Sequence, residues 1–114
     1  METDSIQTNM IQELRRGFLT LAVLAELQEE QYGYSILKLL ADQGLEIDQG
    51  TLYPLLRRLE SQGLLESDWK IEEARPRRYY HLSPAGKATL GIMRQEWQKI
   101  VNIMDQVLKT GDLS

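Results

Sequence analysis

Four leucines in the middle of the chain fall at the i, i+3, i+4 and i+7 positions that line one side of an α-helix: Leu52, Leu55, Leu56 and Leu59. Asp48 precedes them, where its carboxylate can accept hydrogen bonds from the free amide groups of the first turn. Gly63 can end the helix in a left-handed conformation, with Leu64 folding back on Leu59 as in a Schellman motif. The pattern predicts an amphipathic helix between Asp48 and Gly63.

The side of this helix opposite the leucines carries small residues, an aromatic ring and two arginines: Gly50, Thr51, Tyr53, Pro54, Arg57, Arg58 and Ser61. Such a face fits a helix whose N-terminal half enters the major groove of DNA. Pro54 removes one backbone hydrogen bond, so we expect a tight or slightly kinked first turn. The alternative is an ordinary solvated helix face.

A first helix is expected from about residue 9 to 28, because apolar residues recur there at helical spacing: Met10, Ile11, Leu14, Phe18, Leu21 and Leu24. Residues 1 to about 8 are polar and expected to fray. The stretch 18–25 is apolar nearly all round, which indicates burial on more than one side. It is either a central core helix or a helix that also meets a partner subunit.

A second helix is expected from about residue 34 to 43, and its end resembles that of the leucine helix. Leu40, Gln43, Gly44 and Leu45 repeat the stop signal made by Leu59, Gln62, Gly63 and Leu64. The short link 44–49 then joins two helices at an angle. This arrangement is typical of a helix-turn-helix.

After Gly63 the pattern changes to that of a β-hairpin, with strands at about 64–71 and 77–82 and a polar loop at 72–76. A hairpin directly after a helix-turn-helix indicates a winged helix. The wing carries Arg75, Arg77 and Arg78, with Pro76 stiffening the segment, and such a tip can straddle phosphates or enter the minor groove. The alternative is a solvated turn.

Ser83 and Pro84 open a last helix as N-cap and first helical residue, and Gly86 permits close approach to a neighbour. Beyond them lies a heptad seam, widened by Val101 and Leu108: Leu90, Met93, Trp97, Ile100, Met104 and Val107. The seam predicts a homodimer; the alternative is a seam folded back on the chain's own first helix. We therefore expect a mostly α, α+β fold, with a winged helix-turn-helix domain at 1–82 and a C-terminal dimerisation helix at 83–114. We also expect the first helix to contribute to the dimer.

Composition narrows the possible functions. The chain has 114 residues, no cysteine and one histidine, so it offers no disulfide, no thiolate ligand and no evident nucleophile–base pair. No enzyme activity, cofactor or metal is expected. No apolar run approaches the length of a membrane span, and no signal peptide is evident, which favours a cytoplasmic protein without a membrane partner. The net charge is −4, yet residues 57–87 hold seven basic and five acidic side chains, which indicates a local positive patch on an acidic body.

Three stretches together resemble the PadR family of bacterial winged-helix transcriptional regulators: Tyr32–Tyr34, Gly50–Glu60 with Gly63 and Leu64, and Arg75–Ser83 with Gly86. The resemblance covers about residues 12–108, although His81 stands at a position that is commonly basic in the family. It implies a dimeric repressor, each subunit placing its third helix in a major groove and its wing beside the backbone. The single C-terminal helix resembles the short branch of the family, some members of which bind planar aromatic molecules between the subunits against an aromatic of the last helix.

The expected function is therefore sequence-specific DNA binding by a homodimer on a palindromic operator. Gln49 and Thr51 are expected to reach base edges. The remaining candidates for contact with double-stranded DNA are Tyr53, Pro54, Arg57, Arg58, Arg75, Arg77 and Arg78. The candidates for a small aromatic effector are Leu14, Phe18, Met93, Trp97 and Ile100, for which ordinary apolar packing is the alternative. A winged-helix module that binds a protein instead of DNA remains the alternative function.

Overall fold

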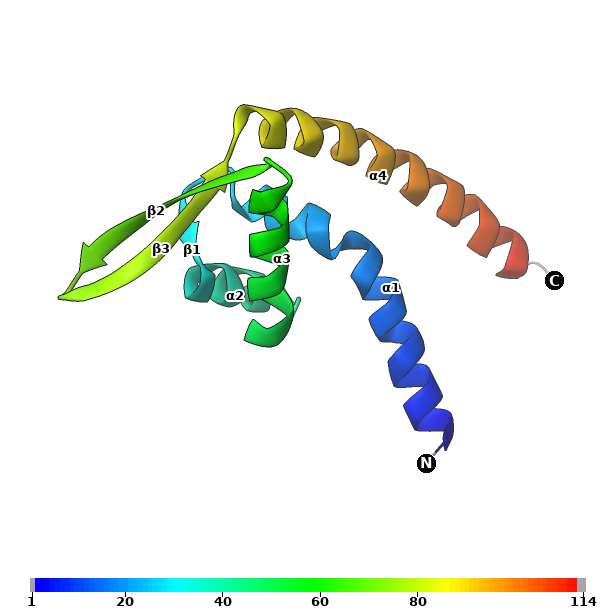
Figure 1. Cartoon of the computed structure of the whole chain (residues 1–114). Helices are drawn as coiled ribbons and strands as arrows, with labels where there is room; N and C mark the ends of the chain where they lie inside the picture. The colour runs from blue at the N-terminus through cyan, green and yellow to red at the C-terminus, as the bar shows by residue number, and fades with distance from the viewer. Residues whose placement is uncertain (1, 113–114) are drawn as a thin grey trace.

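The computed structural model describes residues 2–112 as four helices and a small antiparallel sheet (Figure 1). The elements in chain order are α1 (Glu2–Glu26), β1 (Gln31–Tyr32), α2 (Gly33–Asp42), α3 (Gln49–Ser61), β2 (Leu65–Glu72), β3 (Arg75–Leu82) and α4 (Pro84–Asp112). Within residues 2–112, none of the helices is long and apolar enough to cross a membrane. This is the mostly helical winged helix-turn-helix that the pattern predicts.

The core lies where the second half of α1 meets α2, α3 and the base of the sheet. Val23, Leu24 and Leu27 of α1 are completely buried, as is Ile36 of α2. The four leucines of α3 are between 0% and 8% exposed. The apolar stripe of α3 thus holds the helix against the body, while its other side stays free.

The ends of α2 and α3 have the geometry that their sequences predict. Gly63 has a φ of 81°, and the amide of Leu64 donates to the carbonyl of Leu59 at 3.0 Å. Gly44 has a φ of 96°, and the amide of Leu45 donates to the carbonyl of Leu40 at 2.8 Å. Both helices therefore end in the same Schellman-type turn.

The sheet differs from the predicted two-stranded wing. A third strand, β1, lies beside β3, so the order is β1-β3-β2. Gln31 pairs with Tyr80, and this short strand ties the start of α2 to the base of the wing. The predicted loop 72–76 is also wrong: the turn is only Glu73 and Ala74, both with positive φ, because a two-residue turn of this hand matches the twist of the strands.

Two long arms extend from the body, the N-terminal half of α1 and the C-terminal half of α4 (Figure 1). The radius of gyration is 16.9 Å, compared with about 13 Å for a compact chain of this size. The first helix begins at Glu2 rather than near residue 9, because Ile6 continues the apolar stripe toward Met10, and it ends at Glu26. The expected fraying of residues 2–8 is thus wrong for the described part of the chain.

The start of α4 is fixed against the end of α3. The Ser83 hydroxyl donates to the carbonyl of Gly63 at 2.6 Å and accepts from the amide of Gly86 at 3.0 Å. A Cβ at Gly86 would lie 2.0 Å from the carbonyl oxygen of Leu64, so only glycine permits this approach. These contacts set the direction in which α4 leaves the body.

Candidate nucleic-acid interface

The outer face of α3 is open along its whole length. Thr51, Pro54, Arg57 and Arg58 are exposed, and Tyr53 is partly buried. The helix runs on through Pro54 to Ser61. The structure thus presents the predicted α3 residues together on one solvent-facing side.

Asp48 fixes the first turn of α3. Its carboxylate accepts from the amide of Thr51 at 2.8 Å. Hydrogen bonds from Thr51, first from its side chain and then from its backbone amide, hold the pKa of Asp48 below its ordinary value. The charged cap stabilises the helix end that carries Gln49 and Thr51.

The three wing arginines have different surroundings. Arg75 is exposed beside the turn. Arg77 and Arg78 follow each other along β3 and have different partners, although both line the hollow between α2, α3 and the wing described below. Arg77 lies over the ring of Tyr32, at 4.6 Å from its centroid, and its guanidinium is 3.7 Å from the Glu72 carboxylate.

Arg78 is engaged with α3. Its guanidinium donates to Glu60 at 2.7 Å and to the hydroxyl of Ser67 at 3.0 Å. It also lies 5.5 Å from the ring centroid of Tyr80, and burial raises the pKa of the Tyr80 hydroxyl. Arg78 therefore fixes the wing to α3, a role that the sequence did not indicate because Glu60 lies far from it along the chain.

A hollow of about 360 Å³ lies between α2, α3 and the wing. Its lining is rich in aromatic rings and arginines, including Tyr53, Arg57 and Arg77 of the predicted set. Tyr53 packs against Gly33, where a Cβ would lie 2.2 Å from its ring. Tyr34 and Trp69 also line the hollow and were missed, since an exposed aromatic has no distinguishing spacing in the sequence.

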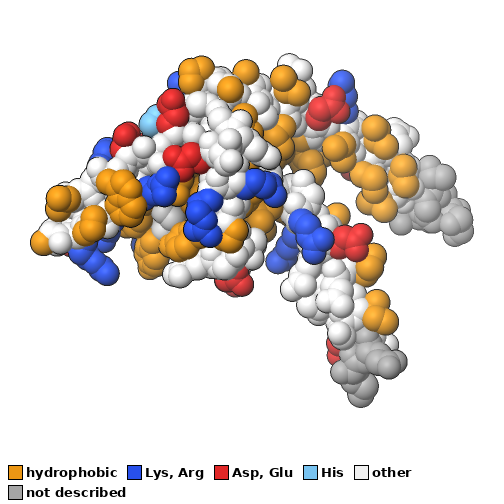
Figure 2. All heavy atoms as spheres, viewed as in Figure 1, with side chains coloured by type: hydrophobic (Ala, Val, Ile, Leu, Met, Phe, Trp, Pro, Cys, Tyr) orange, Lys and Arg blue, Asp and Glu red, His pale blue; other side chains and the backbone are white. Residues whose placement is uncertain are grey.

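Basic side chains gather on this face in a row that runs from the wing over α3 to α1 (Figure 2). Arg57, Arg58 and Arg75 make no ion pair within the described part of the chain. Their charges remain available to an anionic partner. The local positive patch expected from the sequence thus has a defined location.

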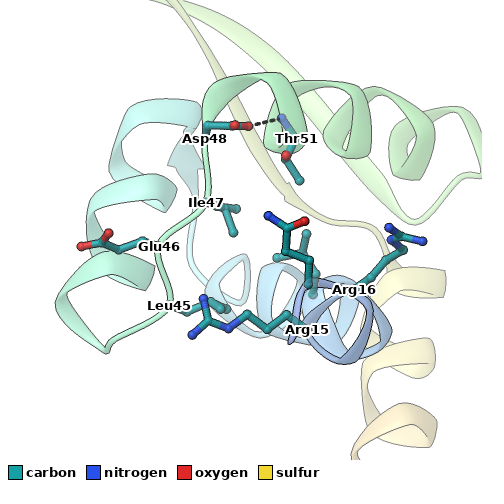
Figure 3. A pocket seen from close by; sticks show the side chains of 9 residues that line it. Arg15, Arg16, Leu45, Glu46, Ile47, Asp48 and Thr51 are labelled. Carbon is teal, nitrogen blue, oxygen red and sulfur yellow. Dashed lines mark hydrogen bonds between the residues drawn. The ribbon is translucent and has the colours of Figure 1, made fainter. Parts of the chain in front are cut away.

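A second hollow, of about 610 Å³, lies between α1 and the N-terminus of α3 (Figure 3). Glu46, Asp48 and Thr51 form one side of it, and Arg15 and Arg16 of α1 border the other. The two α1 arginines were not among the predicted DNA-binding residues. Two adjacent arginines in a helix whose other side is apolar are the feature of the sequence that points to this edge.

The five candidate effector residues come from α1 and α4. Phe18 and Trp97 contact each other edge to face, with ring centroids 6.1 Å apart. Leu14 is 70% exposed and Ile100 is 46% exposed, whereas Met93 packs at the edge of the core. The structure brings Phe18 and Trp97 together and leaves one side of the group open.

One cluster on the outer sheet face has atoms placed for a cation. Ligand atoms of Glu30, Asp68 and His81 lie within 4.8 Å of one another. Lys70 already contacts Glu30, and this hydrogen bond raises the pKa of the Lys70 ammonium. His81 in turn contacts Glu66 at 3.1 Å. Glu30 and His81 therefore already have partners among the protein's own side chains.

Comparison with known proteins agrees with this geometry. A PadR family transcriptional regulator from Eggerthella lenta is 44% identical, with a TM-score of 0.87 over 95% of this chain and 96% of that one. A PadR family regulator from Clostridium difficile is 32% identical, with a TM-score of 0.75 over 80% of this chain and 98% of its own. Transcriptional regulator Rv3488 of Mycobacterium tuberculosis is 37% identical over 70% of this chain and 76% of its own length.

These relatives are transcriptional regulators and not enzymes, as expected for this chain. Residues 20–92 match the transcriptional regulator PadR-like family. The matched segment contains the helix-turn-helix, the wing and the start of α4. The resemblance seen in the sequence is therefore confirmed: this chain belongs to the PadR-like family of transcriptional regulators, whose members bind DNA.

Proposed function

We propose that this chain is a homodimeric repressor that binds a palindromic operator with α3 in the major groove. The observation that carries the proposal is the division of α3 into two sides. Its leucine side is at most 8% exposed, whereas Arg57 and Arg58 on the other side are exposed and form no ion pair with the described residues. A helix so anchored can present its free side to a groove without rearrangement of the core.

Individual roles follow from position along α3 and the wing. Gln49 and Thr51 occupy the leading turn of α3 and would reach base edges. Tyr53, Pro54, Arg57 and Arg58 follow and position the helix on the backbone. Arg75 and Arg77 supply charge from the wing, and Arg78 keeps the wing at a fixed distance from α3 through Glu60.

The dimer is supported by the apolar seam on α4. Trp97, Ile100 and Met104 are between 41% and 46% exposed in the single chain. Exposing such a row of large apolar side chains to water is unfavourable. Burying it against a second copy lowers the free energy. Two copies about a two-fold axis would present their α3 helices to half-sites about 34 Å apart, one turn of DNA.

A planar aromatic molecule between the subunits is the proposed effector. Trp97 offers a ring face beside Phe18, with Met93, Ile100 and Leu14 as apolar neighbours. The effector would relieve repression only if it binds more tightly to a dimer whose α3 spacing does not fit the operator. Such a regulator would act in the cytoplasm, where the operator is.

The DNA-binding test combines operator selection with one substitution. Selection from random duplexes should enrich a palindrome, and Arg57→Ala should weaken binding to it by about 1–3 kcal/mol if Arg57 reads a base edge, or by less if it meets only phosphate. Arg94→Ala, on α4, is the control and should bind as the wild type does. Absence of any enriched sequence would refute operator binding and favour a protein-binding module.

The effector test uses planar aromatic dyes and tryptophan fluorescence. Trp97→Ala should abolish dye binding, because the proposed ring face is lost. Trp69→Ala is the matched control, since Trp69 lies on the wing and is 67% exposed. Equal dye affinity in the two variants would refute the Trp97 site.

A further inference from the structure

Arg15 and Arg16 lie where α1 passes the N-terminus of α3. Both are exposed, and neither forms an ion pair with any residue that the structure describes. They border the hollow of about 610 Å³ whose other side is the first turn of α3, with Thr51. Figure 3 shows the two side chains leaving α1 in different directions below that turn.

This position is on the opposite side of α3 from the wing. The wing lies beside one flank of the helix and α1 beside the other (Figure 1). The row of basic side chains continues from α3 onto α1 on the same face of the molecule (Figure 2). A major groove is bordered by two phosphate backbones, so a helix inserted into it has a backbone on each side.

We propose that Arg15 and Arg16 bind the phosphate backbone bordering the N-terminal end of α3, while the wing binds the backbone on its other side. This inference rests on the proposed operator binding and adds a contact that the wing and α3 do not provide. Arginine suits the role because its guanidinium is always charged and matches phosphate geometry. The arms of α1 and α4 leave the body on this same side. In the proposed dimer these contacts would therefore face the centre of the operator.

The acidic groups on the facing side restrict where the phosphates sit. Asp48 is held by its hydrogen bond to Thr51, and Glu46 is exposed on the link before it. Phosphates are repelled from this side and attracted to the α1 side. The contact is therefore confined to the α1 edge of the hollow.

The test is the salt dependence of binding to the selected palindrome by the full chain. The slope of log K against log salt is negative, and each lost phosphate contact reduces its magnitude by about 0.9, so Arg15→Ala with Arg16→Ala should reduce the magnitude by about 3.6 in a dimer. Raising the salt from about 50 to about 200 mM should then cost the variant roughly 100-fold less affinity than it costs the wild type. The selected sequence should not change, since phosphate contacts carry no base information.

Two further variants separate this contact from general charge effects. Lys87→Ala with Arg94→Ala removes the same charge from a different hollow, beside the start of α4, and should keep the wild-type slope. Arg15→Lys with Arg16→Lys should retain most of the slope, because lysine still meets a phosphate as a point charge.

Three outcomes would overturn the inference: a wild-type slope in the double alanine variant, an equal loss in the Lys87 and Arg94 control, or loss of the dimer in sedimentation of the alanine variant. Arg57→Ala distinguishes these from failure of operator binding. If Arg57→Ala weakens binding while the α1 variant does not, the repressor proposal stands and only the α1 contact is refuted.

Discussion

Helices α3 and α4 carry similar apolar stripes and meet opposite surroundings. Both place large apolar residues at helical spacing along one side, and both begin at a hydrogen-bonded cap, Asp48 or Ser83. The leucines of α3 are at most 8% exposed. On α4 five of the seam residues are between 41% and 61% exposed from Trp97 to the end of the seam: Trp97, Ile100, Met104, Val107 and Leu108.

The difference shows that a periodic stripe defines a helix face without specifying what covers it. The second half of α1, α2 and the sheet surround α3, so its stripe is satisfied within the chain. Only the first part of the α4 seam, at Leu90 and Met93, reaches that core. From Trp97 onward the seam extends past the core: Trp97 contacts Phe18 of α1, and the seam residues beyond it stay largely open among the described residues.

The largest expected effect comes from placing charge on the open seam. Ile100→Glu with Met104→Glu should raise the dimer dissociation constant at least about 1,000-fold, because four apolar side chains worth roughly 1.5–3 kcal/mol each are lost per dimer. Sedimentation equilibrium measures the mass, and circular dichroism should show an intact helical body.

The matched control adds the same charge on the other side of α4, as Gln95→Glu with Asn102→Glu. Those two residues are exposed and lie away from the seam, so the dimer should persist. A seam variant with the mass of the wild type, or a wild type that sediments as a monomer, would contradict the homodimer.

The α3–α4 contrast also marks the limit of sequence-based prediction. The helices, the caps at Gly44 and Gly63 and the hairpin were predictable, because each depends on neighbours within a few residues. The pairing of Arg78 with Glu60 was not, since it depends on how β3 crosses α3. The strand β1 has only two residues and therefore no periodicity, and the Glu73–Ala74 turn lacks the glycine or asparagine that would signal positive φ.

The α3 stripe can be tested by truncating one buried leucine. Leu56 is 1% exposed, so Leu56→Ala should lower the free energy of unfolding by about 2–5 kcal/mol through lost transfer energy and a residual cavity. Urea unfolding followed by circular dichroism gives the change.

The control for this substitution is an exposed residue of α4, Ile92→Ala. Ile92 is 63% exposed and off the seam, so this change should stay within about 0.5 kcal/mol. Similar losses at Leu56 and Ile92 would show that burial does not distinguish the two helices as described.

The smallest expected effect lies at the two caps and concerns pH. Hydrogen bonding from Thr51 holds the pKa of folded Asp48 below the ordinary value of 3.8, so the folded state favours the charged carboxylate. The resulting stabilisation is fully present above pH 3.8 and is lost as the pH falls through the lower folded pKa. Asp48→Asn keeps a capping oxygen without titration, so its stability relative to the wild type should improve as the pH drops through this range.

Ser83 provides the comparison at the start of α4, because its hydroxyl does not titrate in this range. Ser83→Ala should destabilise the fold by the same amount at every pH, through loss of the bonds to Gly63 and Gly86. Urea unfolding of both variants and the wild type between about pH 3 and 6 measures the two trends against the expected acid window. If the difference between wild type and Asp48→Asn does not vary with pH, the charged cap contributes nothing specific to α3, and the two helices begin alike.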